Sequence, residues 1–95
     1  MGDAPPLDAD AFNAFEAAGW EGRVDAYDRF FTAITARLFD PLLDAVGVAP
    51  RTRLLDVASG PGHLAARAAE RGAVPVGVDV ADAMVRRAVA ALTRM

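Results

Sequence analysis

Apolar residues recur at helical spacing near the start of the chain. After a polar, proline-rich stretch over residues 1–10, which we expect to form a mobile arm, Phe12, Phe15 and Ala18 lie three residues apart. This spacing predicts a short helix over "DAFNAFEAAGWEG" that ends at one of its two later glycines.

A longer apolar stripe follows from residue 23 onward. Its members recur at steps of three and four and are Val24, Tyr27, Phe31, Ile34 and Leu38. This period predicts one amphipathic helix that buries the stripe. Pro41 interrupts the pattern and predicts a second helical piece, "PLLDAVG", which stops at Gly47.

The second half of the chain alternates short apolar runs with alanine-rich helical patterns. "RLLDVAS" predicts a buried strand, and "AVPVGVDVA" predicts a second one. "HLAARAAER" predicts a helix between them with Gly72 at its C-cap, and "DAMVRRAVAALTRM" predicts a final helix with Asp82 as N-cap or first-turn acid. The predicted buried face of that last helix consists of Met84, Val85, Ala88, Val89 and Leu92.

This order predicts an α/β fold. Residues 1–50 form an N-terminal arm and helical segment, and residues 51–95 form a βαβα unit with parallel strands and a right-handed crossover. A two-stranded parallel sheet is a poor independent structure, because parallel sheets are normally wide and covered on both faces. We therefore expect the first half of a doubly wound, Rossmann-like sheet, which another copy or a second polypeptide would complete.

Composition narrows the class of protein. Hydrophobic residues make up 54% of the 95 positions and the net charge is −3, so neither disorder nor a nucleic-acid partner is indicated. The chain has no cysteine, which excludes disulfides, thiolate metal sites and a cysteine nucleophile. The sequence shows no secretory signal and no apolar run that would span a membrane, which predicts a cytoplasmic protein. All ten Lys and Arg positions are arginine, which, with the abundant alanine, suggests a bacterial source.

The stretch "LLDVASGPGH" carries the clearest candidate chemistry. Gly60 and Gly62 leave the backbone open to a ligand, and the helix after them presents free N–H groups. Asp79 follows 19 residues after Gly60, at the end of the next strand, where a carboxylate can accept hydrogen bonds from ribose hydroxyls. Together with Ala65, the glycines match the dinucleotide-binding pattern G-x-G-x-x-G/A.

Asp56 bears on the choice of ligand. It lies on the strand before the loop, where a pyrophosphate about 4 Å away would be repelled by roughly 4 kcal/mol at an effective dielectric near 20. A cationic ligand would be attracted instead. S-adenosylmethionine carries an ammonium and a sulfonium, together with an adenosine for Asp79 to hold.

"LLDVASGPGHLA" followed by "VGVDVADAMVRRA" resembles the Rossmann-like, S-adenosylmethionine-dependent methyltransferases, and residues 20–95 resemble the small-molecule enzymes of the ubiquinone and menaquinone type. Ala58 stands where the family has its first loop glycine. The resemblance implies that Asp56, Gly60 and Gly62 border the methionine part of the cofactor, Asp79 holds the ribose, and Val80 and Met84 flank the adenine. It implies methyl transfer to a small-molecule acceptor without a metal, from an N-terminal part of the enzyme, and it names no catalytic residue.

Other interpretations stay open at this point. The module could bind NAD(P) or FAD in an oxidoreductase, or it could be a non-enzymatic interaction remnant. Asp56 could orient the loop through backbone N–H groups. His63, the only histidine, has no partner acid visible in the sequence, which favours a structural role. Tyr27 fits the apolar stripe, although Tyr27 or Trp20 could face a ligand.

Overall fold

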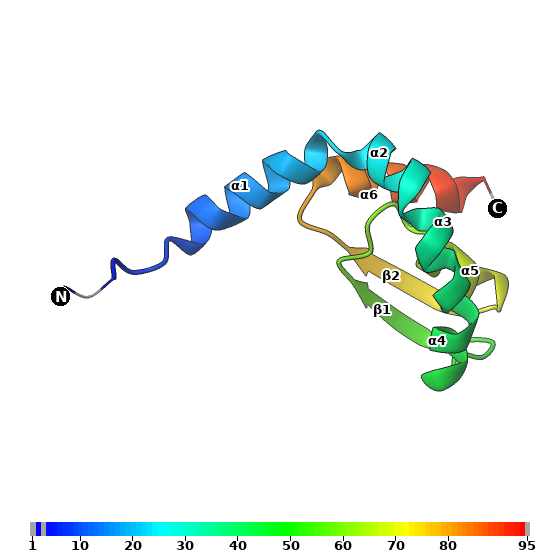
Figure 1. The fold of residues 1–95 in the computed structure, drawn as a ribbon. Coiled ribbons are helices and arrows are strands. Elements are labelled where there is room, and N and C mark those ends of the chain that lie inside the picture. Colours follow the sequence, from blue (N-terminus) through cyan, green and yellow to red (C-terminus); the bar gives the residue numbers. More distant parts are fainter. Residues whose placement is uncertain (1, 3, 95) are drawn as a thin grey trace.

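The computed structural model describes residue 2 and residues 4–94. The elements run in the order α1 (Ala9–Glu21), α2 (Val24–Phe30), α3 (Thr32–Thr35), the 3-10 turn η1 (Ala36–Leu38), α4 (Phe39–Ala45), β1 (Arg53–Val57), α5 (His63–Glu70), β2 (Val74–Val78) and α6 (Asp82–Thr93). Figure 1 shows α1 projecting from one end of a body that contains the other elements.

The two strands pair in parallel and form one two-stranded sheet. Leu55 lies opposite Val76, and Val57 lies opposite Val78. The predicted order of strand, helix, strand and helix is confirmed, with α5 as the connection between parallel strands. The described fold is thus a mixed one, with helices and a small parallel sheet.

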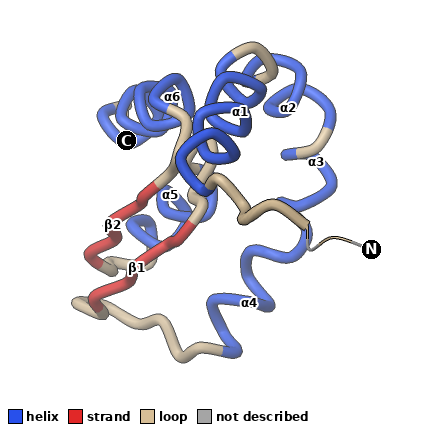
Figure 2. The backbone as a smooth tube through the Cα atoms, turned by 90° about the vertical axis from the view of Figure 1, so that its left-hand side faces the viewer, coloured by secondary structure: helices blue, strands red, loops and turns tan. Residues whose placement is uncertain are grey.

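The sheet is covered on one face only. Leu54 packs into a core formed with α5, and α5 lies behind the two strands in Figure 2. The opposite face carries five exposed apolar side chains: Leu55, Val57, Val74, Val76 and Val78. The prediction of buried strands is therefore wrong for this face, because alternate side chains point away from α5 and no described element packs over them.

Two small cores hold the body together. One joins α4 and α5 through Leu43, Val48, Ala68 and Ala73, with Leu54 and Leu64 packed against it. The other joins the first two helices to α6 through Val24, Ala81 and Met84, with Trp20 and Tyr27 packed against it. The second core brings two aromatic side chains to the carboxyl ends of the strands. Val89, predicted to belong to the buried face of α6, is 55% exposed.

The helix predicted from the apolar stripe is broken into three pieces. The break follows Phe30, and the Thr35 hydroxyl donates to the carbonyl oxygens of Phe31 and Thr32, at 3.3 Å each. Such bonds from threonine to its own helix bend the backbone. Val24 is the buried member of the stripe, whereas Phe31, Ile34 and Leu38 are exposed. The prediction of one helix with a buried stripe is therefore wrong.

The helix boundaries near residues 8 and 41 also differ from the prediction. Asp8 caps α1 by accepting from the Ala11 N–H at 2.9 Å, so the helix begins inside the expected arm. The helix α4 begins at Phe39, with Pro41 in its first turn, where no intrahelical N–H bond is lost.

A cluster of ion pairs fixes α4 against α5. The guanidinium groups of Arg67 and Arg71 both donate to the Asp40 carboxylate, at 2.8 Å each, and lower the pKa of Asp40 to about 2. This cluster holds the end of α5 that lies away from the loop "SGPG". Within residues 4–94, none of the helices combines the length and apolar character needed to cross a bilayer.

Candidate functional site

The loop between β1 and α5 has an unusual backbone. Ala58, Gly60 and Gly62 all have positive φ angles, of 58°, 57° and 88°. Left-handed backbone costs a residue with a side chain roughly 1–2 kcal/mol, which glycine avoids. Ala58 therefore adopts a glycine-like conformation at an energetic cost.

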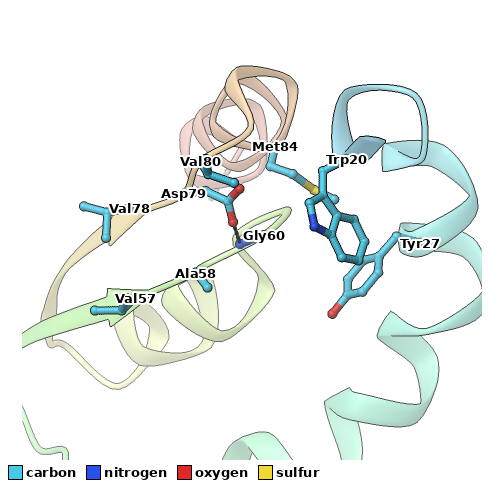
Figure 3. Close-up of a pocket in the computed structure, with 9 residues that line it drawn as sticks. All are labelled: Trp20, Tyr27, Val57, Ala58, Gly60, Val78, Asp79, Val80 and Met84. Atoms are coloured by element: carbon cyan, nitrogen blue, oxygen red, sulfur yellow. Dashed lines mark hydrogen bonds between the residues drawn. The ribbon is translucent and has the colours of Figure 1, made fainter. Parts of the chain in front are cut away.

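Asp79 ties this loop to the second strand. Its Oδ2 accepts from the Gly60 N–H at 2.8 Å (Figure 3). Its Oδ1 accepts from the Ala81 N–H at 2.9 Å. The Ser59 N–H donates to the Val78 carbonyl at 2.9 Å beside them. Asp79, rather than Asp56, thus orients the loop. Each carboxylate oxygen has two lone pairs, so Asp79 retains capacity to accept from a ligand.

A pocket of about 500 Å³ opens at the carboxyl ends of the strands. Five of the seven predicted cofactor-binding residues line it: Ala58, Gly60, Asp79, Val80 and Met84. Figure 3 shows Asp79 and Gly60 at its centre, with Trp20 and Tyr27 on the opposite side from the strand ends. The volume is in the range of sites for small organic ligands, roughly 300–1,000 Å³.

Gly60 and Gly62 differ in the space beside them. A Cβ on Gly60 would have Tyr27 as its nearest neighbour, at 4.0 Å, so this glycine faces open space beside the pocket. A Cβ on Gly62 would lie 2.6 Å from the Ala88 Cβ, so the space beside this glycine is filled by α6. Gly62 lines neither this pocket nor its neighbour.

Asp56 lies on the helix-covered face of β1 and lines a second, smaller cavity. Burial raises the pKa of Asp56, and the negative charge of Asp79 raises it further. The two carboxylates are therefore close enough to interact, although Asp56 does not line the larger pocket.

Trp20 and Tyr27 form the aromatic wall of the larger pocket. Their rings meet edge to face, with centroids 5.6 Å apart. Both pack against the Met84 core and both line the pocket, so Tyr27 belongs to a core and also borders the cavity.

His63 has a partner that the sequence did not reveal. Its Nε2 lies 2.6 Å from Asp28 Oδ1, and Asp28 Oδ2 accepts from Arg87 Nη1 at 3.0 Å. Arg87 also pairs with Asp25. Asp28 lies 35 residues before His63 and its carboxylate is 20% exposed. Asp28 directly follows Tyr27 in the sequence, but no local sequence signal shows that α2 packs near the start of α5.

No family model matches this chain, and no curated protein or solved structure matches it either. Its function must therefore be argued from the site.

Proposed function

We propose that this chain is the cofactor-binding part of an S-adenosylmethionine-dependent methyltransferase that acts on a small molecule, a bacterial, cytoplasmic enzyme. The observation that carries the proposal is the link between Gly60 and Asp79 inside the larger pocket, at the carboxyl ends of two parallel strands. Open α/β sheets bind ligands at this edge. In this proposal the parallel strands and their helices belong to a Rossmann-like sheet.

The residues present fit the proposed cofactor. Asp79 has free lone pairs for ribose hydroxyls, and Val80 and Met84 offer apolar surface to an adenine. Gly60 lets a ligand approach the loop backbone. The neighbouring carboxylates Asp56 and Asp79 make the site negative, which favours a ligand with an ammonium and a sulfonium over a pyrophosphate.

When bound, S-adenosylmethionine would supply an electrophilic methyl group, so the protein's main contribution is alignment and exclusion of water. Trp20 and Tyr27 are suited to this part, because they line the pocket opposite the strand ends and aromatic rings attract cations.

Calorimetric titration tests this proposal. We expect S-adenosylmethionine to bind and NADH not to bind. Asp79→Asn should weaken binding by about 1.5–3 kcal/mol, the range for a hydrogen bond to a charged group. Asp82→Asn removes an exposed carboxylate at the start of α6 and should leave the affinity unchanged.

Binding of NADH without S-adenosylmethionine would identify a dinucleotide module instead. Binding of neither ligand would favour the non-enzymatic remnant. Thermal melts of both variants would show whether a loss of affinity reflects unfolding of the loop that Asp79 holds.

A further inference from the structure

A second cavity of about 150 Å³ adjoins the cofactor pocket. Tyr27 and Ala58 line both, so the two spaces meet at these residues. Phe39 and Leu64 give the smaller cavity an apolar wall, and His63 lies among its polar residues. A cavity of roughly 150 Å³ accommodates a ring of about the size of benzene.

The contact with Asp28 leaves one nitrogen of His63 available. Asp28 Oδ1 lies 2.6 Å from Nε2, which places the proton of the neutral imidazole on Nε2 and leaves Nδ1 as an acceptor. Arg87 holds the other Asp28 oxygen at 3.0 Å, so the carboxylate is fixed from both sides. This is the arrangement of a histidine base oriented by an acid.

Thr32 provides a separate sign that the cavity suits a polar group. It lines the cavity, and its buried hydroxyl has no hydrogen-bond partner within the described chain. Buried hydroxyls are normally paired, so a ligand hydroxyl that reaches Thr32 would remove an unfavourable feature.

The charges around the cavity disfavour an anion. Asp56 lines the cavity, and Asp28 contacts His63 at its edge. Arg87 approaches this group from α6 but is paired with Asp25 and Asp28. A neutral ligand is therefore favoured over a carboxylate or a phosphate.

We propose that this cavity binds the hydroxyl end of a small, neutral ring compound and that His63 accepts its proton. The O–H bond breaks, its electron pair stays on the oxygen, and the proton bonds to Nδ1, while Asp28 stabilises the resulting imidazolium. The proposal rests on the proposed function and deepens it, because it makes that oxygen the methyl acceptor.

The test uses the full chain and 4-nitrophenol, whose ionised form absorbs visible light and whose acidity is close to that of imidazole. His63 is the only histidine, so its ring resonance needs no assignment by mutagenesis. We expect 4-nitrophenol to shift this resonance saturably and to gain a nitrophenolate band when bound. The matched ligand 4-nitrotoluene lacks the hydroxyl and should bind about tenfold more weakly or worse.

Two variants separate proton transfer from binding. His63→Gln can still hydrogen-bond but has no basic nitrogen, so it should bind 4-nitrophenol by calorimetry without the visible band. Asp28→Asn should reduce the band, whereas Asp44→Asn, which changes an exposed carboxylate paired with Arg71, should not. An unchanged band in His63→Gln, equal binding of the two ligands, or no binding overturns the proposal.

Titration with S-adenosylmethionine runs separately. Binding of S-adenosylmethionine without 4-nitrophenol would overturn the hydroxyl site and leave the proposed function standing. Binding of 4-nitrophenol without S-adenosylmethionine would support the hydroxyl site but would contradict its assignment as a methyl-acceptor site.

Discussion

At the scale of single residues, the charge of Asp56 affects the larger pocket although its side chain does not line that pocket. The resemblance implied that Asp56 borders the methionine part of a cofactor; in the structure its side chain lies on the helix-covered face of β1 and lines the smaller cavity. It still interacts with Asp79, because both carboxylates lie at the same end of the sheet and burial weakens solvent screening. Asp56 thus makes the site more negative, and its ionised form also lowers the stability of the folded protein.

Asp56→Asn should stabilise the fold at neutral pH. The folded pKa of Asp56 lies above its ordinary value of 3.8, because of burial and then the charge of Asp79. Its ionisation therefore lowers stability as the pH rises through the folded pKa, and the advantage of the variant should vanish below about pH 3.8. Thermal melts from pH 3 to pH 7 measure this, and Asp82→Asn serves as the exposed control. Equal stability of wild type and Asp56→Asn at pH 7 would contradict the argument.

The same Asp56 variant should bind S-adenosylmethionine more weakly.

At the scale of elements, the two glycines of the loop between β1 and α5 have different surroundings. Gly60 faces the pocket side of the loop, whereas Gly62 lets α5 begin directly against α6. The loop's conformation and the packing of the last helix are therefore coupled through one residue. Sequence spacing made the two glycines look equivalent, because it contains no information about Ala88.

Gly62→Ala should destabilise the protein by about 2–4 kcal/mol, since it adds both backbone strain and overlap with α6. The new Cβ would lie 2.8 Å from the Ala88 Cα, so the helix backbone itself must shift. Gly47→Ala is the matched control: its φ is +72° and nothing lies within 4 Å of the added Cβ, so strain alone, about 1–2 kcal/mol, is expected. Chemical denaturation of both variants gives the comparison, and equal losses would show that the contact with Ala88 relaxes freely.

At the scale of the whole molecule, the dominant feature is the exposed apolar face of the sheet, opposite α5. Leu55, Val57, Val74 and Val76 are each more than half exposed on neighbouring positions of two strands. A contiguous apolar patch of this kind indicates an association surface, and a two-stranded parallel sheet is rarely stable without further cover.

We expect concentration-dependent self-association of the isolated chain through this face. Replacing Val57 and Val76 together by threonine keeps the branched shape but adds hydroxyls, and it should shift the sedimentation profile toward monomer. Val89→Thr, on α6, is the control at another valine that is more than half exposed and should leave the profile unchanged. A wild-type chain that stays monomeric at all concentrations would refute the expectation.

Much of the local structure could be predicted from residue order. The alternation of apolar runs with alanine-rich segments, and with it the places of Gly60 and Asp79 just after the two strands, depends on local residue order. The C-cap of α5 was predicted at Gly72 and is Arg71, with Gly72 next at a φ of +84°. Short-range sterics and periodicity decide these features, which is why both strands and the helices beside them lie near their predicted places.

Other features depend on contacts between distant segments, which periodicity does not encode. The break of the Val24–Leu38 stripe, the exposed face of the sheet, the filling of the space beside Gly62 and the pair of Asp28 with His63 all arise from how the helices pack. A side chain's burial is set by what packs over it, and that is a property of the assembled fold. The loop "LLDVASGPGH" was thus visible as a candidate ligand site in the linear chain, whereas the cavity and the histidine pair beside it exist only once α2 lies near the start of α5.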